Sequence, residues 1–348
     1  MASKNSIKIG ASLPLTGTLK TLGEERYSGM KIAIDNINKQ GGIDGKKIEF
    51  IVKDDQYNAQ HAVLNTIDLI TKDHVDILAG YTGTATVMNI FPLLVQYNQL
   101  LFFPYTGYSG FNKAPYNDYL ILNRPSIWDE VDKLIDYLVR QGKKNIGIFY
   151  QLDSFGMDGV SRVRQLEESL DFTISIEVNF KRGKPFTASF NKEAHLLMQH
   201  NSDAVITIAP YEATAGVIKS LRTAGSDILV ANLSAANKTD VEKLLKPYPD
   251  VFKHNFVFSQ VVPSDITSSI YNSYLKQATY NSLFEFEGYL HILRLTTLIK
   301  NHKSQNYDTL DHTLTEIKMS KDLTENLQFL FHKEIYLVER RAGKWVYL

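Results

Sequence analysis

Loops rich in small hydroxyl residues and aromatic rings carry the clearest chemical signal in this sequence. The run YTGTAT at 81–86 follows an apolar segment and opens a predicted helix. Free backbone N–H groups and the positive dipole end of a helix favour a carboxylate or another anion at such a position. The residues alone favour a plainer interpretation, in which a threonine hydroxyl only caps the helix. Both interpretations stay open on this evidence.

A second loop, PYTGYSG at 104–110, offers the same mixture of hydroxyls, small residues and rings, with simple turn formation as its alternative. Three more aromatic residues stand at or just after predicted strand ends: Tyr150, Phe155 and Tyr211. A single ring of this kind more often serves packing than binding. Together these two loops and three aromatic positions offer hydroxyls, backbone donors and rings but few charges. Such a composition is typical of a small-molecule pocket.

Enzyme and metal chemistry find little support in the sequence. The closest pair of the nine histidines, His195 and His200, is five residues apart, which does not place both on one helix face. The chain has no cysteine and no Gly-x-Gly-x-x-Gly after a strand, so thiolate catalysis and a dinucleotide site lack support. Ser28 and Lys31 match a Ser-x-x-Lys motif, but no Lys-Thr-Gly accompanies it. We therefore predict no catalytic residue, no cofactor and no bound metal.

The charge balance argues against nucleic acid as a partner. The chain has 38 basic and 38 acidic residues, whereas binding to phosphates needs a basic surplus on one face. Residues 77–112 contain no Asp, Glu, Lys or Arg. This segment is not a membrane span, because polar residues interrupt every apolar run well short of roughly 18 residues. It suits a buried strand–helix–strand unit with uncharged polar loops.

Strands and helices alternate along the chain in two runs. Such alternation requires crossover connections and predicts an α/β protein with two doubly wound, Rossmann-like lobes. The third strands of the two runs end alike, in small residues, then Tyr, then Ala and Thr entering a helix (77–86 and 205–215). Ligands of open parallel sheets bind at the carboxyl ends of the strands, so two such edges facing each other would form a cleft. The predicted strands lie at 7–13, 48–52, 75–78, 100–103, 145–150, 172–178, 203–209 and 227–232.

The ordered series of motifs resembles the type I periplasmic binding proteins, the solute receptors of branched-chain amino acid ABC transporters. The resemblance begins with GASLPLTGTLKTLGEERYSGMKIAIDNINKQGGIDGKKIEFIVKDDQYN at 10–58. It continues through GYTGTAT, FFPYTGYSGF, LNRPSIWDEVDKLIDYL, IGIFYQLDSFGMDGV, SLRTAGSDILVANLS, VFSQVVP, FEGYL and ERRAGKWVYL. The series covers nearly the whole chain, and its specificity lies in the order rather than in any one motif.

The resemblance implies the type I periplasmic binding protein fold, in which two lobes close over a ligand by hinge bending. It implies three crossover strands between the lobes, near 122–125, 259–263 and 330–334. It also implies the division of the chain, with residues 7–122 and 262–330 in lobe 1, residues 123–261 and 331–348 in lobe 2, and the ligand cleft between them.

The resemblance also implies where the ligand binds. In lobe 1 the family's ligand turn and threonine loop fall on residues 83–85 and 105–107, and in lobe 2 the family's aromatic residues fall on Phe155 and Tyr211. Tyr150 joins them from its strand-end position, and Ser234 from the place of a ligand-binding acid in the family. The predicted ligand-binding residues are Gly83, Thr84, Ala85, Tyr105, Thr106, Gly107, Tyr150, Phe155, Tyr211 and Ser234.

The sequence departs from the family at that acid. The residue that pairs with the ammonium of an amino-acid ligand should lie near Leu233-Ser234, and no carboxylate is there. An unpaired buried ammonium is costly. Either Glu212, Asp153 or Glu285 substitutes, or the ligand is a carboxylate, an amide or another neutral polar molecule.

The sequence is compatible with three hypotheses about its function. The first is a monomeric periplasmic solute-binding protein, its signal peptide removed, that delivers a small polar ligand (amino acid, amide or small carboxylate) to the membrane permease of an ABC importer. The second keeps the fold in a cytosolic ligand-sensing regulator, like the amide sensors that resemble this family. The third is an α/β enzyme, which the absence of a nucleophile–base set in the sequence disfavours. We expect the first.

Overall fold

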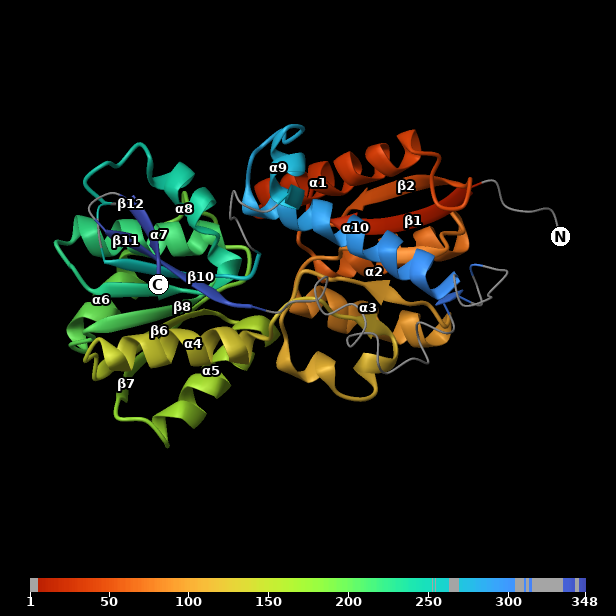
Figure 1. The fold of residues 1–348 in the computed structure, drawn as a ribbon. Coiled ribbons are helices and arrows are strands. Elements are labelled where there is room, and N and C mark those ends of the chain that lie inside the picture. The colour runs from red at the N-terminus through yellow and green to blue at the C-terminus, as the bar shows by residue number, and fades with distance from the viewer. Residues whose placement is uncertain are drawn as a thin grey trace. The chain divides into compact units, whose positions relative to one another are not determined.

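A computed structural model describes residues 6–251, 253, 255–262, 269–303, 310, 313, 314, 334–341 and 344–348. The chain divides into two compact units (Figure 1). The segment Gly107–Ser109 groups with unit 2, whereas the sequence division places it in lobe 1. Unit 1 comprises Met1–Thr106, Gly110–Arg124 and Ser264–Lys333, and unit 2 comprises Gly107–Ser109, Pro125–Pro263 and Glu334–Leu348.

Unit 1 is built on a five-stranded parallel sheet with the order β2-β1-β3-β4-β5. Its central strands are apolar and buried, as a parallel sheet covered on both faces requires. Because β3, β4 and β5 are neighbours, the loops that follow them meet at one edge of the sheet. The strands are β1 (Ser6–Leu13), β2 (Lys47–Asp54), β3 (Ile77–Ala79), β4 (Leu101–Phe102) and β5 (Leu120–Ile121).

Helices α1 and α10 lie side by side in unit 1 (Figure 1). Two glycines permit the close approach: a Cβ on Gly29 would come within 1.8 Å of the Glu285 carbonyl oxygen, and one on Gly288 within 2.4 Å of the Arg26 carbonyl oxygen. The helices of the unit are α1 (Lys20–Lys39), α2 (Ala59–Thr71), α3 (Thr84–Gln96), α9 (Ser269–Leu275) and α10 (Leu283–Lys303). Of the 3₁₀ turns, η2 (Tyr116–Asp118) lies in this unit, and η1 (Ser109–Asn112) runs into it from unit 2.

Unit 2 has a seven-stranded sheet with the order β12-β11-β10-β9-β8-β6-β7. Strands β6 to β9 are parallel, as predicted, and β10 pairs with β9 in parallel as well. Strands β11 and β12 form an antiparallel hairpin that the sequence patterns did not reveal. Of the third predicted crossover, near 330–334, only Glu334 lies within the described residues. The strands are β6 (Asn145–Gln151), β7 (Thr173–Phe180), β8 (Ala204–Ile208), β9 (Leu229–Asn232), β10 (Phe256–Gln260), β11 (Tyr336–Arg341) and β12 (Lys344–Tyr347).

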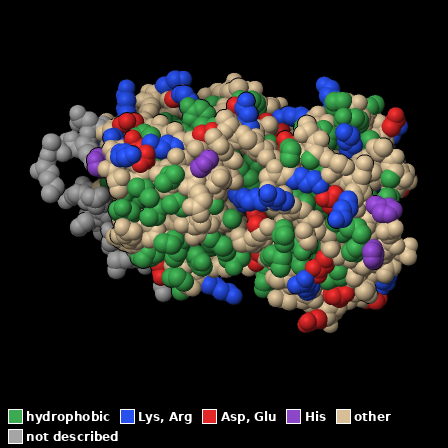
Figure 2. Space-filling model, turned by 180° about the vertical axis from the view of Figure 1, so that it is seen from behind, with side chains coloured by type: hydrophobic (Ala, Val, Ile, Leu, Met, Phe, Trp, Pro, Cys, Tyr) green, Lys and Arg blue, Asp and Glu red, His purple; other side chains and the backbone are tan. Residues whose placement is uncertain are grey.

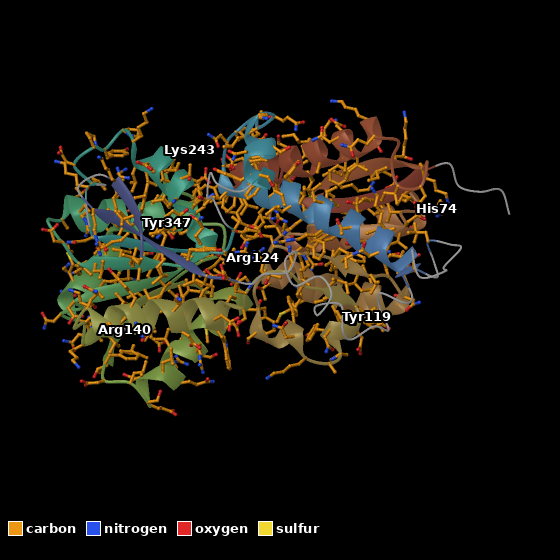
Figure 3. The ribbon with its side chains drawn as sticks, in the orientation of Figure 1. His74, Tyr119, Arg124, Arg140, Lys243 and Tyr347 are labelled. Carbon is orange, nitrogen blue, oxygen red and sulfur yellow. The ribbon has the colours of Figure 1, made fainter. Side chains whose placement is uncertain are left out.

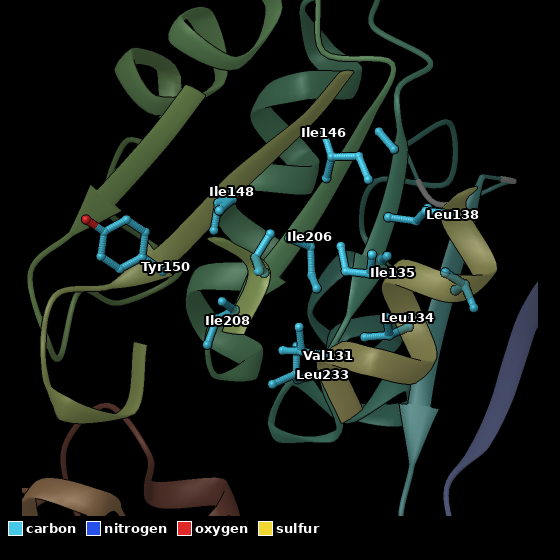
Figure 4. Packing of buried hydrophobic residues seen from close by; sticks show 14 of the residues in the cluster. Val131, Leu134, Ile135, Leu138, Ile146, Ile148, Tyr150, Ile206, Ile208 and Leu233 are labelled. Atoms are coloured by element: carbon cyan, nitrogen blue, oxygen red, sulfur yellow. The ribbon is translucent and has the colours of Figure 1, made fainter. Parts of the chain in front are cut away.

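The core of unit 2 forms between helix α4 and the parallel strands. A capping box starts the helix, since the Ser126 hydroxyl accepts from the Asp129 N–H and the Asp129 carboxylate accepts from the Ser126 N–H. The apolar face of the helix then packs against isoleucines of β6 and β8 (Figure 4). The helices and turns of the unit are α4 (Ile127–Arg140), α5 (Ser154–Glu167), α6 (Asn191–Gln199), α7 (Tyr211–Thr223), η3 (Ser234–Ala236) and α8 (Lys238–Leu245).

Across the described part of the chain, we find no helix with the length and apolar character that a membrane crossing needs.

Truncating Leu134 in this core should destabilise unit 2. We expect Leu134→Ala to lower the free energy of unfolding by about 2–5 kcal/mol, because it leaves a cavity among fully buried side chains. Both tryptophans of the chain, Trp128 and Trp345, lie in unit 2, so their fluorescence during urea unfolding follows this unit. The matched control is Leu152→Ala, where the side chain is 54% exposed and the change should stay within about 0.5 kcal/mol.

Candidate ligand-binding site

The two predicted loops of unit 1 lie against each other. The Tyr105 N–H donates to the Tyr81 carbonyl at 2.6 Å, and the Gly83 N–H donates to the Tyr105 carbonyl at 3.0 Å. Thr82 and Tyr105 form a parallel bridge. These bonds extend the pairing of β3 and β4 past the ends of the strands. The structure therefore brings residues 83–85 together with Tyr105 and Thr106 at the carboxyl edge of the sheet.

The structure excludes the interpretation in which a threonine caps helix α3. Helix α3 begins at Thr84, so its N-cap is Gly83, which has no side chain to form a cap. Gly83 has φ 98°, in the left-handed region that glycine adopts without steric cost. The Thr84 hydroxyl instead lies 2.7 Å from the Thr106 hydroxyl, where it joins the two loops.

The first turn of α3 presents backbone N–H donors for which the described part of the chain offers no acceptor. The first N–H groups of any helix lack an intrahelical partner. Among the described residues, no acceptor is found for the N–H groups of Thr84, Ala85 and Thr86. The hydroxyls of Thr82 and Thr86 are buried and also lack a partner there. Such a group of donors at the positive end of a helix can bind a carboxylate.

The Tyr105 ring belongs to the packing of the edge. It is 7% exposed, and the guanidinium carbons of Arg26 and Arg124 lie 4.7 Å and 4.2 Å from its centroid. Arg124 (Figure 3) also donates to the Glu287 carboxylate on α10. Tyr105 thus positions the loop through its backbone bonds and its ring, while the hydroxyls at Thr84 and Thr106 supply the polar chemistry.

Burial sets the protonation of this charged cluster. It lowers the pKa of Arg26 and of Arg294 to about 10, so both stay charged at pH 7. Burial opposes ionisation of Glu287, but the attraction of Arg124 helps to outweigh it, and the pKa of Glu287 lies well below its usual range. Burial lowers the pKa of His291 to about 3, so its imidazole is neutral at pH 7.

Gly107 makes different contacts from the other predicted residues of its loop. It belongs to unit 2, where its carbonyl accepts from the Ile127 N–H at 2.6 Å. A Cβ at this position would come within 2.7 Å of the Pro125 carbonyl oxygen, so only glycine fits. Two residues further on, Ser109 donates through its N–H and its hydroxyl to the Asp158 carboxylate. The structure thus gives Gly107 a close-packing role beside the start of α4.

Unit 2 gathers its predicted residues at the carboxyl edge of β6, β8 and β9, which are neighbours in the sheet. Tyr150 lies in β6 beside Ile208 and belongs to the hydrophobic core, and Phe155 packs against that core. Tyr211 is the first residue of α7 and is buried. Tyr150 and Phe155 therefore show the packing role that a single ring most often has.

A carboxylate does lie at Ser234, and it comes from another element. Glu130, in the first turn of α4, accepts from the Ser234 N–H at 2.8 Å, from the Ser234 hydroxyl at 2.9 Å and from the Ser259 hydroxyl. Its side chain is 3% exposed, and no basic side chain among the described residues forms an ion pair with it. The sequence does not point to Glu130, because it lies on another element, 104 residues before Ser234.

The three substitutes considered for the acid make other contacts. Glu285 accepts hydrogen bonds from two hydroxyls and three backbone N–H groups within unit 1. Asp153 caps α5 and pairs with Arg182. Glu212 accepts from the Phe186 N–H, and burial raises its pKa. Glu130 is a buried carboxylate of unit 2, and no cationic partner is found for it in the described residues.

Metal and nucleic-acid chemistry gain no support from the surfaces. In the residues that the structure describes, no group of three or more His, Cys, Asp or Glu side chains could hold a metal ion. On the face shown in Figure 2, basic and acidic side chains are interspersed, without the single-sign stripe that phosphates require.

The chain thus has two α/β units built mainly on parallel strands, and unit 1 carries hydroxyl-rich loops at its strand ends. Loops at the carboxyl ends of parallel strands are where α/β proteins of this kind bind ligands. The chain belongs to the periplasmic binding protein family, whose model matches residues 6–331. This membership confirms the resemblance found in the sequence. It also agrees with the prediction that the protein is not an enzyme, because the family has a non-enzymatic binding fold.

Curated relatives are distant. The chain is 23% identical over 242 residues to Leu/Ile/Val-binding protein homolog 3 of Brucella melitensis, an alignment that covers 69% of this chain and 64% of the relative. It is 24% identical over 224 residues to homolog 8 of Brucella abortus, covering 59% and 54%. The chain thus spans less than two thirds of the length of the curated relatives it matches.

Solved structures confirm the fold. A substrate-binding periplasmic protein from Ralstonia solanacearum superposes with a TM-score of 0.86 at 21% identity, covering 99% of this chain and all of the other. A branched chain amino acid ABC transporter protein from Thermus thermophilus with bound valine gives 0.85 at 14% identity, covering 99% and 95%. A fatty acid ABC transporter substrate-binding protein from Thermomonospora curvata gives 0.83 at 16% identity, covering 99% and 91%.

Titration of His291 tests the buried charge cluster. We expect its imidazole to stay neutral from pH 7 to about pH 4, because burial holds its pKa at about 3. The unfolded histidine titrates near pH 6.5, so stability from this residue is complete above about pH 6.5 and is lost as the pH falls toward 3.

The measurement is the imidazole NMR signal, assigned by its loss in His291→Gln. The matched control is His195→Gln, which assigns an exposed histidine on α6 in the same spectra. A midpoint near pH 6.5 for His291 would contradict a neutral, buried imidazole.

Proposed function

We propose that this chain is the solute-binding component of an ABC importer and captures a small polar ligand that carries a carboxylate. One observation carries the proposal. The first turn of α3 presents the N–H groups of Thr84, Ala85 and Thr86 without an acceptor in the described residues, beside the hydroxyl pair of Thr84 and Thr106. A carboxylate supplies several acceptor positions and the negative charge that a helix N-terminus favours.

The printed names of the relatives support the same chemistry. The Brucella relatives are called Leu/Ile/Val-binding proteins, the Thermus structure contains valine, and the Thermomonospora protein belongs to a fatty acid transporter. These ligands differ in their side chains and in the presence of an ammonium group. A carboxylate is common to all of them, and it is the group that the edge of unit 1 suits.

Glu130 favours an amino acid over a fatty acid within this class. It is a buried carboxylate without a cationic partner in the described residues, and buried charges are normally paired. A ligand ammonium would provide that partner. The acid that the family places near residue 233 would then be supplied by α4, through the bonds that Ser234 and Ser259 donate to Glu130.

The proposed cycle is that of a periplasmic monomer. The two units close on the ligand by hinge bending, and a membrane permease receives it. Family membership supports the periplasmic location, and the separate compact units support hinge motion.

A thermal-shift panel tests the ligand class. We expect L-valine, L-leucine or L-isoleucine to raise the melting temperature, because a ligand that binds only the folded form stabilises it. Isobutylamine, which is valine without its carboxylate, should give no shift. A shift with isobutylamine equal to that with valine would contradict the role of the carboxylate.

Thr84→Ala tests the site itself. We expect it to weaken binding of the active amino acid by about tenfold, or about 1.4 kcal/mol, because a hydroxyl beside the bound carboxylate is lost. The melting temperature of the free protein should fall only slightly, because one side-chain hydrogen bond to Thr106 is lost while the N-cap, Gly83, is unchanged. Thr71→Ala, at an exposed end of α2, is the matched control and should bind as wild type. Unchanged affinity in Thr84→Ala would place the ligand elsewhere.

A further inference from the structure

Asn123 is a buried amide without a hydrogen-bond partner among the described residues. Its side chain is 4% exposed, and neither its oxygen nor its nitrogen has a partner there. An amide can accept through its oxygen and donate two N–H groups. Burying these groups without partners opposes folding, because their hydrogen bonds to water are lost and nothing replaces them.

Asn232 shows how a buried amide is normally accommodated. It is fully buried in β9 of unit 2. Its oxygen accepts from the Thr207 hydroxyl at 2.7 Å, and its nitrogen donates to the carbonyls of Val230 and Val257 at 3.1 Å and 3.0 Å. The same type of side chain is therefore fully bonded in unit 2, whereas in unit 1 Asn123 finds no partner among the described residues.

Asn123 lies at the edge of unit 1 that carries the proposed site. It follows β5, and the pairing of β4 with β5 continues through the bond from the Phe103 N–H to the Ile121 carbonyl at 2.8 Å. The chain after Phe103 leads directly into Tyr105 and Thr106. The residue after Asn123 is Arg124, whose guanidinium lies 4.2 Å from the Tyr105 ring centroid.

Two further neutral groups at this edge have no hydrogen-bond partner in the part of the chain that the structure describes. They are the buried hydroxyls of Thr82 and Thr86, in the loop and first turn after β3. Folded proteins satisfy the great majority of buried polar groups, so each exception needs a reason. A ligand can be such a reason, because a ligand group that pairs with these side chains is present only in the complex.

We propose that Asn123 is a specificity-determining residue of this site and recognises a neutral ligand group that both donates and accepts a hydrogen bond. A carboxamide or a hydroxyl has this property. A carboxylate only accepts and an ammonium only donates, so each would leave one side of the amide unpaired. The inference rests on the proposed function, and adds to the carboxylate a second, neutral polar group on the ligand.

Two pairs of amino acids of nearly equal shape test this inference by isothermal titration calorimetry. L-asparagine matches L-leucine and tests a carboxamide, while L-threonine matches L-valine and tests a hydroxyl. We expect wild type to bind the polar member of at least one pair about tenfold more tightly than its apolar partner, because the apolar ligand leaves Asn123 unpaired. In Asn123→Leu, which keeps the approximate shape, that preference should disappear.

The free Asn123→Leu protein should melt at a higher temperature than wild type, since an unpaired buried amide has been removed. Asn232→Leu is the matched control. It should lower the melting temperature, because three bonds are lost, and should keep the ligand preference of wild type.

Each outcome decides the inference. Equal binding of both members of each pair by wild type would overturn it and leave the proposed function standing. The same ligand preference in Asn123→Leu as in wild type would also overturn the inference, and Asn123 would then have no role in ligand recognition. Binding of none of the four amino acids would overturn the proposed amino-acid ligand together with this inference.

Discussion

Backbone hydrogen bonds between the loops after β3 and β4 hold the start of α3 in place. The bonds from Tyr105 to Tyr81 and from Gly83 to Tyr105 continue the sheet beyond its strands. Gly83 can then turn with a positive φ and release the chain into the helix. The hydroxyls of Thr84 and Thr106 meet as a consequence. Because the N-cap is a glycine, it has no side chain to accept from the first N–H groups of the helix, and no other acceptor for them is found among the described residues.

Buried charged residues pack against the loop after β4 and help to position it. The segment 77–112 has no charged residue of its own, yet the Tyr105 ring packs against the guanidiniums of Arg26 and Arg124. Glu287 compensates part of that charge by accepting from Arg124. Breaking such a pair by removing one partner is strongly destabilising, since an uncompensated charge stays buried. The uncharged loop of the site is thus positioned by charged residues that lie far away in the sequence.

Much of the fold could be predicted because its signals are local. In α1, Met30, Ala33 and Ile34 have the three- and four-residue spacing of one helix face, and all three are buried. A similar row of apolar residues that begins at Val131 in α4 belongs to the core of unit 2. The two hydroxyl loops of unit 1 could also be predicted, since parallel strands place their ends at one edge. The choice between a threonine cap and a ligand site stayed open, because the pattern of residues does not reveal that Gly83 is the N-cap and takes a positive φ.

Features that depend on distant contacts could not be predicted. Glu130 reaches Ser234 across 104 residues of sequence. That Asn123 has no partner among the described residues depends on every group that surrounds it in the fold. The place of β11 beside β10 joins segments about 80 residues apart, such as Phe258 and Val338. Periodicity and turn residues carry no information about such partners.

The central claim is that the first turn of α3 binds the carboxylate of the ligand. The most direct measurement is the change in backbone amide NMR signals on titration with the amino acid that stabilises the protein most. The account predicts that the amides of Thr84, Ala85 and Thr86 shift strongly, and that the corresponding amine without a carboxylate leaves them unchanged. Saturating binding that leaves these three amides unmoved would contradict it.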